Sequence, residues 1–364
     1  MTDSPPRPEI DLEVLGQFQR RLFSNLQGAL TAALVHLGDR LGLYTALAES
    51  PAPQSSMELA ERTGLVERWV REWAFNQGAA GLVVVEGDGD RLSLTPEAAA
   101  VMASPDHEAF GMGEFDSLPD YLGSIDAVAN SFRTGVGRNY DSGGTAAAIG
   151  LERSFEPWHR HHLVTDVLPA LEGVTAALAD GIDVADVGCG AGGAVLLMAA
   201  AFPASRFTGY DISRHALDRA AERLRESGSA NAAFADPRDQ PLPDDRRLGL
   251  VTMFDCLHDM TDPQGVAEAV RSSLADDGTW LLVDIKALDT YAGNVERNPM
   301  AALMYGFSVL SCMSSGLSEA GGAGLGTLGM SESTARDIAT NAGFTRFRRL
   351  HIDHPTNAFY EIRP

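Results

Sequence analysis

A glycine-rich segment in the second half of the chain has the residue types needed to hold a small ligand against the backbone. Residues 184–193 read VADVGCGAGG, so an apolar run leads directly into closely spaced glycines. Glycine has no Cβ, which lets a ligand approach the main chain before the next helix begins. The spacing is shorter than the G-x-G-x-x-G form of dinucleotide-binding turns, although Gly193 weakens that contrast. Taken alone, the segment also fits an ordinary strand-to-helix turn.

Acidic side chains end the next two apolar runs. Asp211 comes about twenty residues after the glycines, where a carboxylate can accept hydrogen bonds from both hydroxyls of a ribose. It can also cap a helix N-terminus, and the two roles do not exclude each other. Asp236 follows the third run and is a candidate acceptor for the amino group of an adenine. Together the glycines and the two aspartates indicate an adenosine-containing ligand.

His258 follows the fourth apolar run, in the segment FDCLHDMTD at 254–262. An imidazole titrates near neutral pH, so it can take a proton from an acceptor group. Such a base contributes roughly 10²–10⁴-fold in rate, whereas alignment of the reactants alone contributes about 7–11 kcal/mol. A histidine that only positions the substrate is therefore the alternative.

These residues need a parallel sheet to bring them together. From residue 182 onward, short apolar runs alternate with helical patterns, which predicts a Rossmann-like, doubly wound α/β sheet of seven strands. Only a short turn at 354–357 separates the last two runs, so they should form an antiparallel hairpin. The expected strands are 183–187, 206–211, 232–235, 248–255, 279–285, 346–352 and 358–362, and the expected helices are 192–202, 213–226 and 263–274.

The N-terminal part has a different pattern. Leucines and Phe18 recur at three- and four-residue steps over 12–26 and again over 30–41, which predicts two helices with apolar faces suited to a partner subunit. Two further helices over 56–64 and 67–77 and a hairpin over 82–95 follow in the order of a winged helix. Residues 55–100 hold eight acidic side chains against four arginines, so DNA binding is disfavoured. We therefore expect a helical dimerisation domain over 1–105, linker and lid helices over 106–180, and the sheet domain over 181–364.

Composition supports this organisation. The 364 residues carry a formal net charge of −22, which disfavours nucleic acid and anionic membranes as partners. The three cysteines are scattered, the apolar stretch at 26–47 is interrupted by polar residues, and residues 1–13 lack the pattern of a signal peptide. These features predict a cytoplasmic protein. His159, His161 and His162 lie on different faces of an expected helix, so we expect solvated surface there and no metal site.

With these motifs together, the sequence resembles the class I S-adenosylmethionine-dependent methyltransferases. The resemblance implies S-adenosylmethionine as cofactor and S-adenosylhomocysteine as product. It implies that the methionine portion contacts Asp186, Gly188 and Gly190, the ribose Asp211, and the adenine Asp236. Tyr210 and Ile212 would flank the adenosine, and Phe254 is a further expected cofactor contact.

The segment around His258 resembles small-molecule O-methyltransferases with an N-terminal winged-helix dimerisation domain. Their Leu-His-Asp-Trp-x-Asp motif carries the general base, and here Met260 replaces the tryptophan. Asp284 stands where that family has a glutamate orienting the base. The chain is also similar to actinobacterial winged-helix methyltransferases, which share the RTGxG linker at 133–137. In these families the residues corresponding to 299–313 cover the acceptor site.

The resemblance implies a homodimeric enzyme that methylates a small-molecule acceptor, with oxygen as the favoured target. N-methylation and C-methylation of a 2-oxo acid are the enzymatic alternatives. The C-methylating relatives hold iron through a second histidine in the lid, and 299–313 contains none. A winged-helix regulator that senses S-adenosylmethionine is the non-enzymatic alternative.

Overall fold

The computed structural model describes residues 9–364, in a chain that divides after Pro105 into two compact units. The first unit starts with helix α1 (Leu12–Arg40), a single helix of 29 residues. The expectation of two helices over this stretch is wrong. The step from Leu26 to Leu30 continues the spacing of the apolar stripe, and an internal glycine such as Gly28 costs a helix only about 1 kcal/mol. The prediction about a signal peptide falls mostly on residues outside the described range.

A winged helix follows α1, as expected. The Ser55 hydroxyl accepts the Glu58 N–H at 3.2 Å while the Glu58 carboxylate accepts the Ser55 N–H at 2.6 Å, so a capping box opens helix α3 (Ser56–Thr63). The core of this unit forms around Trp73, whose indole N–H donates to the Leu34 carbonyl at 3.0 Å. Its remaining elements are α2 (Leu43–Ala48), α4 (Glu67–Ala79), β1 (Val84–Glu86), β2 (Arg91–Ser93) and α5 (Pro96–Met102).

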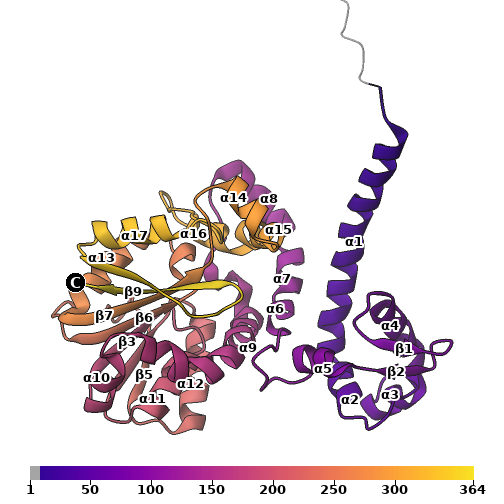
Figure 1. Ribbon diagram of the computed structural model, residues 1–364, viewed down its shortest axis with the longest axis horizontal. Coiled ribbons are helices and arrows are strands. Elements are labelled where there is room, and N and C mark those ends of the chain that lie inside the picture. The colour runs from indigo at the N-terminus through magenta and orange to yellow at the C-terminus, as the bar shows by residue number, and fades with distance from the viewer. Residues whose placement is uncertain (1–8) are drawn as a thin grey trace, which may run out of the picture. The chain divides into compact units, whose positions relative to one another are not determined.

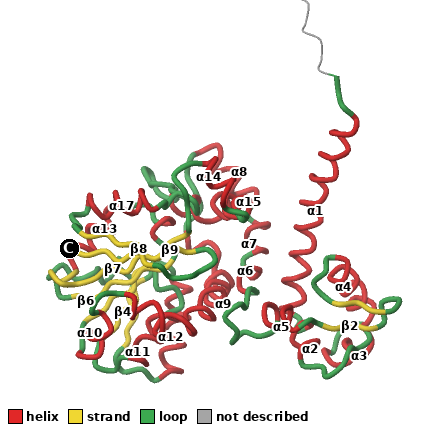
Figure 2. The backbone as a smooth tube through the Cα atoms, viewed as in Figure 1, coloured by secondary structure: helices red, strands yellow, loops and turns green. Residues whose placement is uncertain are grey.

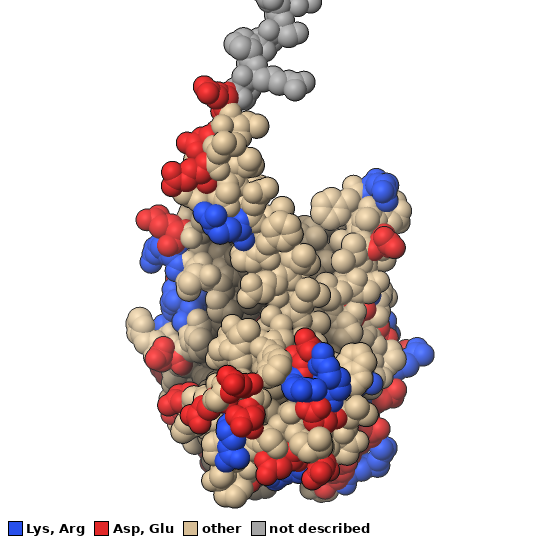
Figure 3. Space-filling view, turned by 90° about the vertical axis from the view of Figure 1, so that its right-hand side faces the viewer, with Lys and Arg blue, Asp and Glu red and all other residues tan. Residues whose placement is uncertain are grey.

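Helix α1 carries large apolar side chains that its own unit leaves uncovered. Figure 3 shows mostly uncharged surface along its length, with the charged side chains toward one side. Exposed side chains of this kind are Leu12, Val14, Leu15, Phe18, Leu22, Phe23, Leu26, Leu30 and Leu37.

The second unit is built on the predicted α/β sheet (Figures 1 and 2). The strand order is β5-β4-β3-β6-β7-β9-β8, with the first five strands parallel and β9 antiparallel to both β7 and β8. The terminal antiparallel hairpin is therefore confirmed. The strands are β3 (Asp183–Val187), β4 (Arg206–Tyr210), β5 (Ala232–Ala235), β6 (Leu248–Phe254), β7 (Leu274–Ile285), β8 (Arg346–Leu350) and β9 (Asn357–Arg363).

Alternate strand residues enter two separate hydrophobic cores. In β3, Val184 lies in one core while Ala185 and Val187 lie in the other, as the two-residue period of a strand requires. Helices α13 (Pro263–Ser273) and α17 (Glu332–Asn341) cover one face, and α10 (Val174–Asp180) and α11 (Gly193–Ala201) cover the other (Figure 1). Helix α12 (Arg214–Ser227) packs beside α11 and β5.

The expected linker and lid segments are largely helical. Before the sheet lie α6 (Gly113–Asp116), α7 (Leu118–Gly123), α8 (Ile125–Thr134), a 3-10 turn η1 (Tyr140–Gly143), α9 (Gly144–His162), a π-helical segment η2 (Leu163–Val167) and a 3-10 turn η3 (Leu168–Ala170). After β7 come α14 (Tyr291–Arg297), α15 (Ala301–Phe307), a π-helical segment η5 (Ser308–Cys312) and α16 (Met313–Gly316). Among the described residues, no helix combines the length and apolarity needed to cross a membrane.

Candidate active site

The glycine turn after β3 is held tightly against the neighbouring strand. The N–H groups of Gly188 and Cys189 both donate to the carbonyl of Tyr210, at 2.8 and 3.0 Å. Gly188 has φ +74°, and a Cβ there would lie 2.6 Å from the Sγ of Cys256. Gly190 has φ +53°, and a Cβ there would meet no atom within 4 Å. Backbone conformation therefore favours glycine at both positions, while the space above Gly190 is open to a ligand.

Asp186 lies under this turn, near the end of β3. Its side chain is buried, and the Thr252 hydroxyl of β6 donates to its Oδ1 at 2.6 Å. The strand register places Asp186 directly opposite Thr252. Burial raises the pKa of Asp186 to about 7, although the Thr252 hydrogen bond lowers it. A carboxylate with so few polar neighbours is suited to pairing with a ligand cation.

Asp211 connects the glycine turn to the start of α12. Its Oδ2 accepts the Gly190 N–H at 2.8 Å, and its Oδ1 accepts the Ser213 N–H at 2.7 Å. The side chain is buried, and this burial raises its pKa. Each carboxylate oxygen can accept a second hydrogen bond. Asp211 therefore has acceptor capacity for two ribose hydroxyls and also helps to position the turn.

Asp236, Ile212 and Tyr210, which the sequence also predicts to contact the cofactor, lie in different environments. The carboxylate of Asp236 is paired with the guanidinium of Arg238, which donates from Nε to Oδ1 at 2.8 Å and from Nη2 to Oδ2 at 2.5 Å. The same guanidinium donates to the Ile212 carbonyl at 2.7 Å. The side chain of Ile212 is half exposed. The ring of Tyr210 is buried in the core, so this residue serves the turn through its carbonyl. Sequence reasoning missed Arg238, although its position two residues after Asp236 was the available signal.

Phe254, the last residue of β6, packs against a histidine. The rings of Phe254 and His159 have centroids 4.7 Å apart. Burial lowers the pKa of His159 to about 4, so it is a neutral ring among aromatic side chains. The expectation that His159 is solvated surface is wrong, because α9 turns this residue toward the end of the sheet. A cavity of about 240 Å³ opens beside it, lined also by Phe155, Trp158 and Asp255.

His258 and Asp284 form a buried pair at the carboxyl ends of β6 and β7. His258 lies in a 3-10 turn, Leu257–Asp259, and its Nδ1–H donates to Asp284 Oδ1 at 2.7 Å. The two side chains are 3% and 0% exposed, so solvent does not screen the interaction. Desolvation opposes charge on the ring, but Asp284 and Asp259 outweigh it and hold the pKa of His258 well above its usual range. The pairing expected from the sequence is therefore present in the geometry.

Three residues that sequence reasoning did not select also lie in this part of the unit. The carboxylate of Asp259 faces the second ring nitrogen of His258, with Oδ1 3.0 Å from Nε2. Cys312 comes from η5, and its Sγ lies within 4.8 Å of both a ring nitrogen of His258 and an oxygen of the Asp259 carboxylate. Burial raises the pKa of the Tyr140 phenol, and the charges of Asp211 and Asp259 raise it further. Tyr140 therefore lies close enough to both the glycine turn and the histidine cluster to sense their charges. Sequence distance hid Tyr140 and Cys312, which belong to separate segments, whereas Asp259 directly follows His258 and is part of the same motif.

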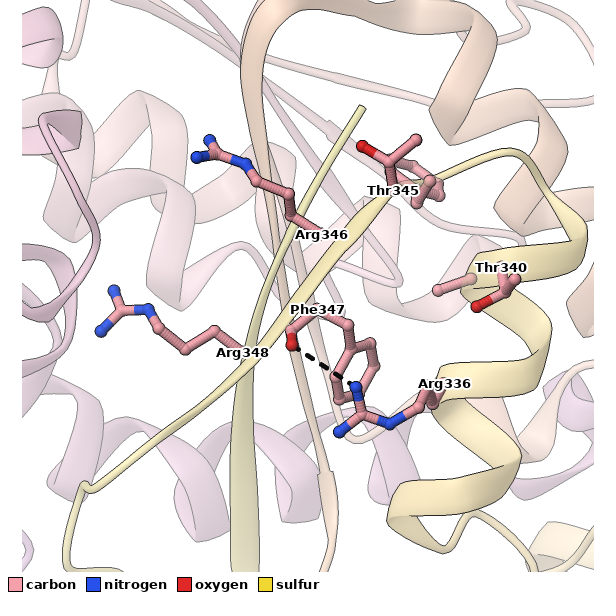
Figure 4. A pocket seen from close by; sticks show the side chains of 8 residues that line it. Arg336, Thr340, Thr345, Arg346, Phe347 and Arg348 are labelled. Carbon is pink, nitrogen blue, oxygen red and sulfur yellow. Dashed lines mark hydrogen bonds between the residues drawn. The ribbon is translucent and has the colours of Figure 1, made fainter.

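A larger pocket of about 430 Å³ lies elsewhere, between α17 and β8 (Figure 4). Its lining includes Arg336, Arg346 and Arg348, and the Arg336 guanidinium lies 4.3 Å from the centroid of the Phe347 ring. Strands β6, β7 and β9 separate β8 from the glycine turn at β3. This pocket is therefore not part of the site described above.

Comparisons with known protein families match part of each unit. Residues 185–280 match the family described as "Methyltransferase domain", and residues 29–104 match "Rv2258c-like winged HTH domain". One curated relative, polyketide synthase ThaQ from Burkholderia thailandensis, is 34% identical over 107 residues, or 29% of this chain. The matching stretch spans only 5% of the length of that relative.

Solved structures resemble the chain over nearly its whole length. Human N-acetylserotonin methyltransferase in complex with S-adenosylmethionine is 17% identical, covers 100% of this chain and 99% of its own, and has a TM-score of 0.68. The mitomycin 7-O-methyltransferase MmcR is 18% identical with coverages of 97% and 100% and a TM-score of 0.69. The O-methyltransferase NcsB1, in complex with S-adenosylhomocysteine and 1,4-dihydroxy-2-naphthoic acid, is 20% identical with coverages of 94% and 98% and a TM-score of 0.60. At these identities the likeness establishes the fold, and the two domain families agree with it. The chain therefore carries a methyltransferase domain after an N-terminal Rv2258c-like winged-helix domain, and its fold is that of S-adenosylmethionine-dependent methyltransferases.

Proposed function

We propose that the protein transfers the methyl group of S-adenosylmethionine to an oxygen of a small-molecule acceptor, with His258 as the general base. The observation that carries this proposal is the His258–Asp284 pair, buried at the same end of the sheet as the glycine turn. The structural neighbours include enzymes named as O-methyltransferases, which supports oxygen as the target.

The residues at the glycine turn suit S-adenosylmethionine. Gly190 leaves room above its Cα, Asp211 has acceptor capacity for the ribose hydroxyls, and Asp186 offers a buried carboxylate to the ammonium group of the methionine portion. Asp236, held by Arg238, retains lone pairs for the adenine amino group. When bound, the cofactor supplies an electrophilic methyl group on a sulfonium.

Within this proposal, His258 accepts the proton of the acceptor hydroxyl at Nε2. Asp284 holds Nδ1 protonated at 2.7 Å and stabilises the imidazolium that forms. Because the pKa of His258 is raised, the ring keeps its proton to a higher pH than an ordinary imidazole and becomes a competent base only as the pH increases. Asp259, now beside Nε2, has to turn away to admit the acceptor. If the histidine only positions the acceptor, alignment supplies most of the acceleration.

The proposal includes a homodimer formed through the N-terminal helices. The large apolar side chains of α1, among them Phe18 and Leu22, are more than half exposed and need a partner surface. A cytoplasmic location is part of the same proposal. Cys189, Cys256 and Cys312 are all free thiols in the structure, which agrees with a reducing compartment.

A transfer assay with defined acceptors tests the proposed function. The protein is incubated with methyl-labelled S-adenosylmethionine and a panel of small aromatic compounds that carry hydroxyl, amino or 2-oxo acid groups. We expect O-methylated products, with loss of product in His258→Ala despite intact cofactor binding. Products methylated only at nitrogen or carbon would contradict the proposal, and so would cofactor binding without transfer to any acceptor, which favours a sensor.

A further inference from the structure

The end of the sheet carries three side chains whose ligand atoms converge. A ring nitrogen of His258, an oxygen of the Asp259 carboxylate and Cys312 Sγ all lie within 4.8 Å of one another, and because Nδ1 is bound to Asp284, Nε2 is the nitrogen available to a ligand. Two of them follow β6 and the third ends the π-helical segment η5, so the fold rather than local sequence brings them together. Neither Asp259 nor Cys312 exchanges a proton or a methyl group in the proposed reaction. Single-turn π-helical segments occur frequently at functional sites.

Second-layer contacts orient two of these side chains. Asp284 accepts the Nδ1–H of His258 at 2.7 Å, which directs Nε2 toward Asp259 and Cys312. A carboxylate bound to the far nitrogen is the usual support of a histidine that ligates a metal. The Thr327 hydroxyl donates to Cys312 Sγ at 2.9 Å, so the sulfur also has a polar partner behind it. Asp284 fixes the tautomer in which Nε2 carries the lone pair of the neutral ring and makes this nitrogen more basic, while the Thr327 hydroxyl stabilises the thiolate of Cys312.

Of these three side chains, Asp259 has the least complete set of hydrogen-bond donors around it. Its Oδ1 is buried and accepts no well-aligned hydrogen bond, although it lies 3.0 Å from His258 Nε2. While the ring is protonated this contact is an ion pair, but in the neutral ring, whose proton is on Nδ1, Nε2 carries no hydrogen and the buried oxygen faces it without a donor, which is unfavourable. A cation placed between Oδ1, Nε2 and Sγ would satisfy this oxygen together with the other two atoms.

We propose that His258, Asp259 and Cys312 bind a divalent cation of the zinc type. One imidazole nitrogen, one carboxylate oxygen and one thiolate form a mixed ligand set that suits Zn²⁺, and three protein ligands leave a fourth coordination position open. Bond lengths of about 2.0–2.3 Å place tetrahedral ligand atoms about 3.3–3.6 Å apart. The present separations, from 3.0 Å to at most 4.8 Å, need only small side-chain movements to reach this arrangement.

The cation and the acceptor proton would compete for the same nitrogen. With Nε2 bound to the ion, His258 cannot accept a proton, so the loaded protein should be inhibited. This consequence, unlike the site itself, rests on the proposed role of His258 as general base.

Cobalt substitution tests the site without any activity measurement. The full-length protein is freed of metal with a chelator and titrated with Co²⁺, whose bond to a thiolate gives a charge-transfer absorbance. We expect one equivalent bound, displacement by Zn²⁺, and at least about tenfold weaker binding in Cys312→Ser and in Asp259→Asn. Cys256→Ser is the matched control, because Cys256 Sγ donates to the Val187 carbonyl at 3.2 Å and lies outside the ligand set. Absence of stoichiometric binding, or equal binding in wild type and Cys312→Ser, would overturn the proposal.

Methyl transfer measured with and without Zn²⁺ separates the two proposals. At least tenfold inhibition in wild type, lost in Cys312→Ser, supports both. Cobalt binding that disappears in Cys312→Ser, together with transfer that Zn²⁺ does not change, would support the metal site and overturn the role of His258 as base.

Discussion

Replacing Asp284 by asparagine should change both the rate of methyl transfer and its dependence on pH. The substitution keeps the size of the side chain and an oxygen for the Ile285 N–H, which Asp284 Oδ1 accepts at 2.8 Å. It removes the negative charge that faces His258 Nδ1 at 2.7 Å. The variant therefore tests the charge of Asp284 with little change in packing.

The magnitude follows from the type of hydrogen bond. A hydrogen bond to a charged partner contributes about 1.5–3 kcal/mol, and both groups are buried, so solvent does not screen it. If the imidazolium forms in the transition state, this loss corresponds to a roughly 10- to 150-fold lower kcat/KM. The pKa of His258 is raised chiefly by the charges of Asp284 and Asp259, so removing one of them lowers it.

The assay is kcat/KM for labelled methyl transfer across a range of pH. In wild type, we expect activity to rise with pH as the raised pKa of His258 is passed, because only the neutral ring accepts a proton. In Asp284→Asn the rise should occur at lower pH and reach a lower plateau. His258→Ala serves as the control, and its profile should be flat unless the acceptor itself ionises. An unchanged midpoint in Asp284→Asn, or a wild-type profile identical to that of His258→Ala, would refute the reasoning.

Three further predictions concern cofactor binding, the turn and assembly. Affinity for S-adenosylmethionine, measured by calorimetry, should increase as pH rises through about 7, because the raised pKa of Asp186 leaves its carboxyl neutral below that value. Asp186→Asn should bind the cofactor more weakly and without this increase. An increase that persists in Asp186→Asn would exclude Asp186 as its source. In thermal unfolding, Gly190→Ala should cost only about 1–2 kcal/mol of backbone strain. Gly188→Ala should cost more, because its Cβ would also overlap the neighbouring thiol, and equal losses would contradict this packing argument. In sedimentation experiments, Phe18→Glu combined with Leu22→Glu should convert a dimer into folded monomers, and an unchanged sedimentation coefficient would place the interface elsewhere.

Much of the second unit could be predicted from the sequence, because its signals are local. Apolar runs with helical patterns between them specify parallel strands, and the short turn at 354–357 leaves the last two strands no room for a parallel crossover. The expectation of a glycine turn between β3 and α11 rests on residues adjacent in sequence. The His258–Asp284 pair also follows from topology, since the carboxyl ends of neighbouring parallel strands meet at one edge.

The neighbours of these residues could not be predicted in the same way. Cys312 reaches His258 only because a π-helical segment follows α15, and periodicity gives no signal for that backbone change. Arg238 pairs with Asp236 through side-chain rotamers that sequence spacing does not determine. The Tyr210 side chain lies in the core, because successive side chains of a strand face opposite sides of the sheet. The prediction that Tyr210 flanks the adenosine rested on the resemblance and did not use this alternation.

The central claim is tested most directly by a transfer assay in an extract of the source cells. It follows a labelled methyl group from S-adenosylmethionine to small molecules of the extract. We expect a labelled product with the methyl group on oxygen, formed by wild type and lost in His258→Ala when cofactor binding is intact. Tight binding of S-adenosylmethionine by wild type without any labelled product would contradict it.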